Sequence, residues 1–150
     1  MICTFLICGC TTPQASSTSK VELTQAEIET IQLKSTLDMD DLVQVKKRVV
    51  IGMVFSGDKD VVSDSCMYRS DTEGNYDMVG VFYPNDMEKA LSYIDEYLSS
   101  LKSECNKKYP EEVFKISNAI EKHNDKEIIL VITSNIESAR KQVESILENQ

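Results

Sequence analysis

The chain has 150 residues, enough for one domain with a hydrophobic core and too few for two ordinary domains. Apolar residues make up 41% and charged residues 27%, a balance typical of globular proteins and not of disordered or fibrous ones. Twenty-five acidic against sixteen basic side chains give a net charge of −9, which argues against nucleic acid or an anionic lipid surface as a partner, and the single histidine excludes any site built from several histidines.

The first twenty residues divide into two parts of opposite character. Residues 1–10 (MICTFLICGC) carry no charge and are mostly apolar, whereas residues 11–20 (TTPQASSTSK) contain six Ser or Thr and no large apolar residue. This contrast predicts an apolar segment joined to a flexible tether. The apolar part ends in Ile7-Cys8-Gly9-Cys10, where a small residue precedes the cysteine.

These four residues resemble the signal of bacterial lipoproteins, which is cut just before a cysteine that then receives lipid. The resemblance implies a signal over residues 1–9 and a lipidated Cys10 at the start of a tether over residues 10–20. Ile7 and Cys8 depart from the usual leucine and alanine or serine, and no Lys or Arg precedes the apolar stretch. In this family an aspartate after the cysteine commonly marks inner-membrane retention, so Thr11 implies an outer-membrane anchor facing the periplasm. The alternative is an apolar N-terminus of a cytosolic protein.

If Cys10 is acylated, the mature chain keeps two cysteines, Cys66 and Cys105. An even pair in an envelope compartment predicts a disulfide between them. The alternative is two buried free thiols that behave as small apolar side chains.

The rest of the chain, residues 21–150, is expected to form a single domain. Thr24 and Glu27 have the spacing of a capping box, which favours a helix from about residue 25, although residues 28–33 also suit an edge strand. Residues 38–48 predict a helix because aspartates stand at its start and basic residues at its end. Its apolar spacing continues to about residue 54, where a buried strand over 49–55 is the alternative.

A β-hairpin is predicted over about residues 59–84, with strands at 61–68 and 76–83 joined by the turn-forming sequence RSDTEGN. Asn85, three residues before Glu88, predicts the N-cap of a helix reaching about residue 103. Pro110 predicts a further helix start, with a strand over 112–117 as the alternative.

The continuous apolar run at residues 127–133 (EIILVIT) predicts a strand, and a final helix is expected over 136–148. These elements predict an α+β fold, a two-layer sandwich. The hairpin and the strand at 127–133 would form a small mixed or antiparallel sheet, with the helices packed on one face.

No motif in the sequence predicts a catalytic, metal or cofactor site. His123 is expected near the end of a helix, in solvent. A thiol-dependent hydrolase that uses Cys66 or Cys105 with His123 is the alternative, and it requires a free thiol. The oxygen-rich stretch from Asp71 to Asp77 has its glycine at the wrong place for a calcium loop, so a polar turn is preferred.

Two tyrosines, Tyr68 and Tyr76, flank the predicted hairpin turn and are expected to contact a partner. Together these features predict a non-catalytic binding or assembly module, held in the envelope by a lipid anchor. Its partner would be another envelope protein. A cytosolic adaptor is the alternative if residues 1–10 are not a signal.

Overall fold

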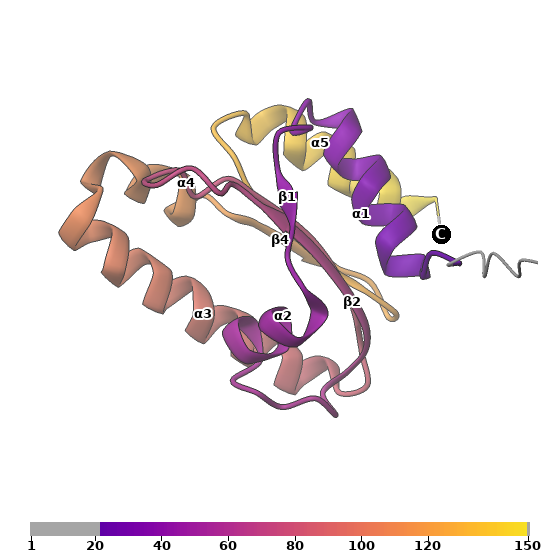
Figure 1. Ribbon diagram of the computed structural model, residues 1–150. Helices are drawn as coiled ribbons and strands as arrows, with labels where there is room; N and C mark the ends of the chain where they lie inside the picture. Colours follow the sequence, from indigo (N-terminus) through magenta and orange to yellow (C-terminus); the bar gives the residue numbers. More distant parts are fainter. Residues whose placement is uncertain (1–21, 150) are drawn as a thin grey trace, which may run out of the picture.

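The computed structural model describes residues 22–149 (Figure 1), so the predicted signal, Cys10 and the predicted tether lie outside the described residues. The described residues form a small α+β fold around one antiparallel five-stranded sheet in the order β1-β2-β3-β5-β4. The strands are β1 (Val43–Gln44), β2 (Val62–Arg69), β3 (Met78–Pro84), β4 (Ile120–His123) and β5 (Ile128–Ile132). The helices are α1 (Gln25–Thr36), α2 (Lys47–Val54), α3 (Met87–Lys108), the 3₁₀ turn η1 (Pro110–Glu112), α4 (Val113–Ser117) and α5 (Ile136–Glu148).

The centre of the sheet is buried on both faces. All five residues of β5 are buried, and their side chains alternate between two hydrophobic cores. Ile128, Leu130 and Ile132 enter one core, whereas Ile129 and Val131 enter the other. A strand that is apolar at every position is stable only when both of its faces are covered.

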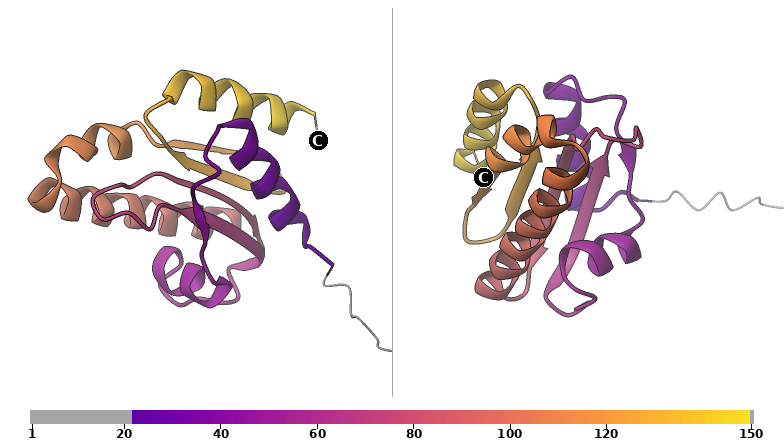
Figure 2. Two further views of the ribbon diagram at one scale, coloured as in Figure 1. Left: turned by 45° about the horizontal axis from the view of Figure 1, so that its top comes forward. Right: turned by 90° about the vertical axis from the view of Figure 1, so that its left-hand side faces the viewer.

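Two sets of helices provide this cover. In Figures 1 and 2, α1 and α5 lie on one side of the sheet, and α2, α3 and α4 lie on the other. Leu33 of α1 and Val143 of α5 share the core of Ile129 and Val131, while Val54 of α2 and Ile94 of α3 pack in the opposite core. The predicted α+β class is confirmed, but the helices cover both faces of the sheet, not the one face that the sequence suggested.

Several predicted elements are confirmed with their local causes. Thr24 caps α1, with its hydroxyl accepting from the Glu27 amide and its own amide donating to the Glu27 carboxylate, so the edge strand is wrong there. The hairpin β2–β3, the strand β5 and the helix α5 all form within the predicted regions.

The helix predicted from residue 38 begins later. Asp38 has a φ of 53°, and the chain then runs as β1 alongside β2, where the Val45 amide donates to the Met67 carbonyl at 2.8 Å. Helix α2 starts only at Lys47, so the alternative strand over 49–55 is also wrong. Tertiary pairing with β2 overrides the charge pattern of residues 38–46.

Two further boundaries differ from the predictions. Asp86, not Asn85, caps α3, with its carboxylate accepting from the Lys89 amide, while Asn85 donates to the Asp60 carbonyl. The segment after Pro110 forms η1 and α4, not the strand alternative, and the chain then enters β4. His123 is therefore an exposed residue of an edge strand, not of a helix end.

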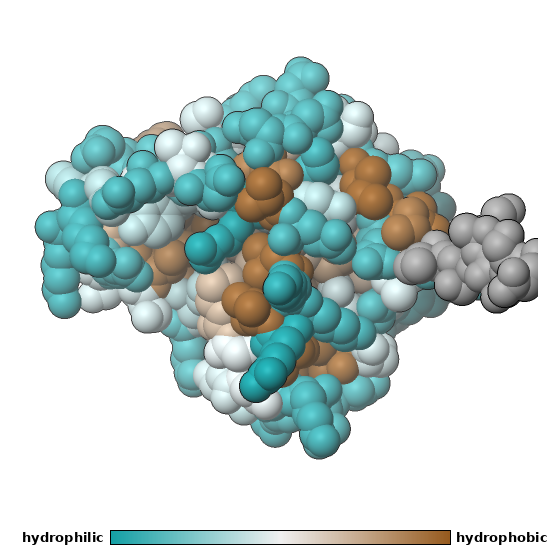
Figure 3. Space-filling view, viewed as in Figure 1, coloured by the Kyte–Doolittle hydropathy of each residue, from teal (hydrophilic) through white to brown (hydrophobic). Residues whose placement is uncertain are grey.

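The surface of the face that carries β1 is mainly polar. Figure 3 shows hydrophobic areas interrupted by hydrophilic side chains on the face that carries β1. Within residues 22–149, no helix has the length and apolar character needed to cross a membrane.

Gly80 of β3 provides a test of the core that packs against α3. An added Cβ would lie 2.7 Å from Phe82 Cζ and 3.3 Å from Met67 Cγ, and the Phe82 ring is fixed edge-on against Phe55 at 5.3 Å. We expect Gly80→Ala to lower the free energy of unfolding by about 1–3 kcal/mol, measured by urea denaturation. The control is Gly52→Ala on the exposed side of α2, where no heavy atom lies within 4 Å of the added Cβ. This control should raise the free energy of unfolding by about 1 kcal/mol through helix propensity. If Gly80→Ala left the free energy of unfolding unchanged, the packing described for this core would be contradicted.

Candidate functional site

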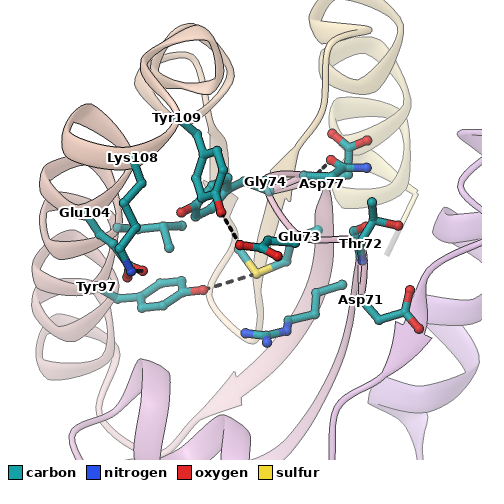
Figure 4. A pocket seen from close by; sticks show the side chains of 15 residues that line it. Asp71, Thr72, Glu73, Gly74, Asp77, Tyr97, Glu104, Lys108 and Tyr109 are labelled. Atoms are coloured by element: carbon teal, nitrogen blue, oxygen red, sulfur yellow. Dashed lines mark hydrogen bonds and ion pairs between the residues drawn. The ribbon is translucent and has the colours of Figure 1, made fainter.

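A pocket of about 330 Å³ lies between the loop joining β2 to β3 and the C-terminal half of α3. We call it the hairpin pocket and define it by the loop residues 70–77 together with Arg69, Tyr97, Glu104, Lys108 and Tyr109. Figure 4 shows Tyr97 and Tyr109 reaching from the helical side toward the loop, and Glu73 reaching back to the Tyr109 hydroxyl.

The floor of the loop is held by one half-buried ammonium group. Lys115 of α4 contacts Asp77 Oδ1 at 2.9 Å, Asn75 Oδ1 at 3.2 Å and Glu112 Oε2 at 2.5 Å. Burial by itself would lower the pKa of Lys115. The bonds to Glu112 and Asp77 outweigh this effect, so the pKa lies above its usual value. The ammonium therefore stays charged, and Glu112 also accepts from the Tyr76 amide at 3.2 Å. Asn75 and Asp77, which the sequence placed in a polar turn, bind a protein cation here.

The rim of the loop is held by a tyrosine and a glycine. The Tyr109 hydroxyl donates to Glu73 Oε1 at 2.7 Å, and this bond, with burial as a second cause, raises the pKa of Tyr109 to about 12. Gly74 has a φ of 79°, and a Cβ at this position would lie 3.0 Å from the Tyr109 ring. Only glycine allows both this backbone conformation and this close approach to the ring.

The walls combine aromatic rings with an excess of negative charge. The Tyr76 and Tyr109 rings lie 6.1 Å apart, and the Tyr97 hydroxyl contacts Met78 Sδ at 3.7 Å. Burial is the main cause that raises the pKa of Tyr97 to about 12. The Tyr97 side chain therefore presents a neutral hydroxyl to the pocket. The charged lining residues are four acids and two bases: Asp71, Glu73, Asp77, Glu104, Arg69 and Lys108. Aromatic faces together with carboxylates favour organic cations.

The two tyrosines predicted to contact a partner do not share a surface. Tyr76 lines the hairpin pocket. Tyr68 packs against the α1–α5 core on the opposite side of the sheet, with the Lys34 ammonium 5.4 Å from its ring centroid. The structure therefore brings one of the two residues to the candidate site.

Cys66 and Cys105 are free thiols, and the predicted disulfide is not formed. Cys66 pairs with Val81, whose side chain belongs to the α1–α5 core, whereas Cys105 lies in the opposite core and donates to the Tyr109 carbonyl at 3.0 Å. The sheet separates the two sulfur atoms, so a bridge would require it to rearrange. The alternative of two buried thiols is the one observed.

His123 lies away from the Cys66 thiol. It lies on β4, and β5 and β3 separate it from Cys66 on β2, a backbone separation of about 14 Å across the sheet. Burial raises the pKa of both Cys66 and Cys105, which disfavours the thiolate that a nucleophile needs. Among residues 22–149, no cluster of His, Cys, Asp and Glu is suited to hold a metal ion.

Two aspartates, Asp58 before β2 and Asp64 within it, are engaged in specific contacts. Asp58 pairs with Lys89 at 2.6 Å, and that bond is the first cause that lowers the pKa of Asp58. Asp64 pairs with Lys47 at 3.4 Å and accepts from the Ala26 amide at 3.2 Å, which ties β2 to α1.

A second polar group, Glu29 with Glu127, was not found by sequence reasoning. Glu29 of α1 is 6% exposed, and Glu127, the residue directly before β5, is fully buried. The Tyr83 hydroxyl of β3 donates to Glu29 Oε2 at 2.7 Å. One sequence signal was available, because Glu29 falls at helical spacing between Ala26 and Leu33 on the buried face of α1.

Comparisons with known proteins add nothing to this geometry. No protein-family model matches the chain, and neither a curated protein nor a solved structure matches it significantly.

Lys115 tests whether the loop is held as described. We expect Lys115→Met to lower the free energy of unfolding by about 1–3 kcal/mol, because Asp77 and Glu112 lose their cation. Amide NMR signals of residues 70–77 should shift as well. Lys108→Met is the matched control, since its pair with Glu104 is exposed and contributes little. Equal effects of the two variants on the loop signals would show that Lys115 does not order the loop.

Proposed function

We propose that the protein is an envelope lipoprotein, anchored to the outer membrane through lipidated Cys10, whose folded part is a non-catalytic binding module in the periplasm. The support for the anchor is the sequence Ile7-Cys8-Gly9-Cys10 followed by Thr11. The support for a binding module is the hairpin pocket.

The observation that carries the proposal is that the pocket is preformed. Lys115 holds the base of the loop, and the bond from Tyr109 to Glu73 holds its rim. A ligand then does not have to order the loop, so less of the contact energy is lost to conformational entropy.

The pocket best fits a basic side chain of another envelope protein. A lysine or arginine side chain would place its apolar stem against the rings of Tyr76 and Tyr109 and its charge near Glu73 and Glu104. The net charge of −9 also favours the approach of a cationic surface. Arg69 and Lys108 in the same lining restrict the orientation, because they repel a second basic group.

The test is site-specific photo-crosslinking in membranes of the native host. A photoreactive residue replaces Thr72, which is exposed on the loop of the pocket, and in a control chain it replaces Asp125, which is exposed in the β4–β5 turn. We expect Thr72 to give an adduct with an envelope protein, and we expect its yield to fall at high salt because screening weakens the charge contacts.

The adduct should also be lost in Glu104→Gln, which removes a carboxylate on the exposed side of α3. Exposed Glu137 on α5, changed to Gln, serves as the matched control and should leave the yield unchanged. The same adducts from Thr72 and Asp125, or a yield that salt does not alter, would contradict the assignment of the pocket.

A further inference from the structure

The buried carboxyl groups of Glu29 and Glu127, which we call the acid pair, lie where α1 packs against the sheet. Glu29 is on α1, and Glu127 is the residue directly before β5. Neither the lipid anchor nor the hairpin pocket makes use of them. Two carboxyl groups in contact inside a protein need an explanation, because a buried negative charge is costly and two of them repel.

The neighbours of the acid pair supply hydrogen bonds from each surrounding element. From α1, Gln25 Nε2 donates to Glu29 Oε1 at 2.5 Å, and from β3 the Tyr83 hydroxyl donates to Glu29 Oε2. From the β4–β5 turn, Asn124 Nδ2 donates to Glu127 Oε1 at 3.3 Å. Lys126, which is exposed, lines the groove outside Glu29 with the apolar Ile146 of α5.

One oxygen of the pair has no donor among the described residues. This is Glu127 Oε2, which is fully buried. A proton on Glu127 turns this oxygen into a donor toward Glu29, so that one proton serves both carboxyl groups. Burial, followed by the contact with Glu29, raises the pKa of Glu127 to about 7, and burial with the bond to Glu29 raises the pKa of Tyr83, which therefore remains a donor.

We propose that α1 is a pH-sensitive latch, docked on the sheet while the acid pair holds a proton and loosened when both carboxyl groups are ionised. Undocking α1 moves Glu29 into water and opens Glu127 to solvent, which relieves the repulsion. The other buried residues of the α1 face are Ala26, Thr30 and Leu33, so Glu29 is the one ionisable group there.

The direction of the pH effect follows from the raised pKa. Between the ordinary carboxyl pKa and about 7, the docked state binds more protons than the undocked state. Docking is therefore strongest at acidic pH, weakens as the pH rises through this window, and does not weaken further above it.

The undocking of α1 has a further consequence if Cys10 carries the proposed lipid anchor. The latch itself does not depend on that anchor. The twelve residues of α1 begin at Gln25, a short distance after the predicted tether over residues 10–20. As a helix they span about 18 Å, and as an extended chain they reach about 40 Å. A rise in pH would thus lengthen the connection between Cys10 and the sheet.

Amide hydrogen exchange of the full chain tests the latch. Exchange is measured at about pH 5 and about pH 8 and corrected for the intrinsic pH dependence of amide exchange. We expect the opening of α1 to increase about ten- to a hundredfold at the higher pH, while α3 stays unchanged. Glu127→Gln, which keeps a neutral donor, should abolish the change, and Glu137→Gln on the exposed face of α5 should preserve it.

Equal opening of α1 at the two pH values in the unaltered chain would overturn the proposal, as would a Glu127→Gln chain that keeps the full pH dependence. If Glu127→Gln does not fold, Glu29→Gln replaces it. With one carboxyl removed, the midpoint of the pH effect should move to lower pH, and an unmoved midpoint would equally overturn the latch. Loss of the lipid anchor alters none of these results, so the two proposals fail separately.

Discussion

The burial of β5 on both faces is the constraint on which the rest of the structure depends. Five consecutive residues, Ile128–Ile132, have no access to water, and their side chains alternate between two cores. A single core would bury only one face of β5, so helices are required on each side of the sheet. The chain meets the requirement with α1 and α5 on one face and α2, α3 and α4 on the other, which leaves β1 and β4 as short edge strands. Short edges also limit pairing with other chains.

The two helical layers have different properties because different polar groups secure them. On the α3 side, the Lys115 ammonium and the bond from Tyr109 to Glu73 fix the hairpin loop, and a preformed pocket results. On the α1 side, Glu29 and Glu127 share a buried site in which two negative charges would repel each other. The raised pKa of Lys115 keeps its ammonium charged at neutral pH, whereas the pKa of Glu127 is raised to about 7 and so lies within the neutral range. A rigid site and an adjustable helix can therefore coexist on one sheet.

The sequence predicted those elements whose cause is local. The capping box of Thr24, the turn residues of the hairpin and the apolar run of β5 act over a few residues, and each element formed as expected. The short strands β1 and β4 were missed because their pairing partners define them; Ile120 continues the helical spacing of Ile116 and yet belongs to β4. Tyr76 was found, but the contacts of Lys115 with Asn75 and Asp77 span about forty residues of chain and leave no local pattern. In the acid pair, Glu29 left a local signal through its place on the buried face of α1, but its contact with the distant Glu127 left none.

The proposed lipid anchor and the two free thiols are tested most directly by the intact mass of the protein. The protein would be purified from membranes of its native host without reductant, and its mass measured before and after thiol labelling. We expect a chain that begins at Cys10, carries acyl groups, and contains Cys66 and Cys105 as two free thiols that label only after unfolding. A mass that retains residues 1–9 with an unmodified Cys10 would contradict the anchor, and a mass two hydrogens lower, with no thiol to label, would contradict the fold's separation of the two cysteines.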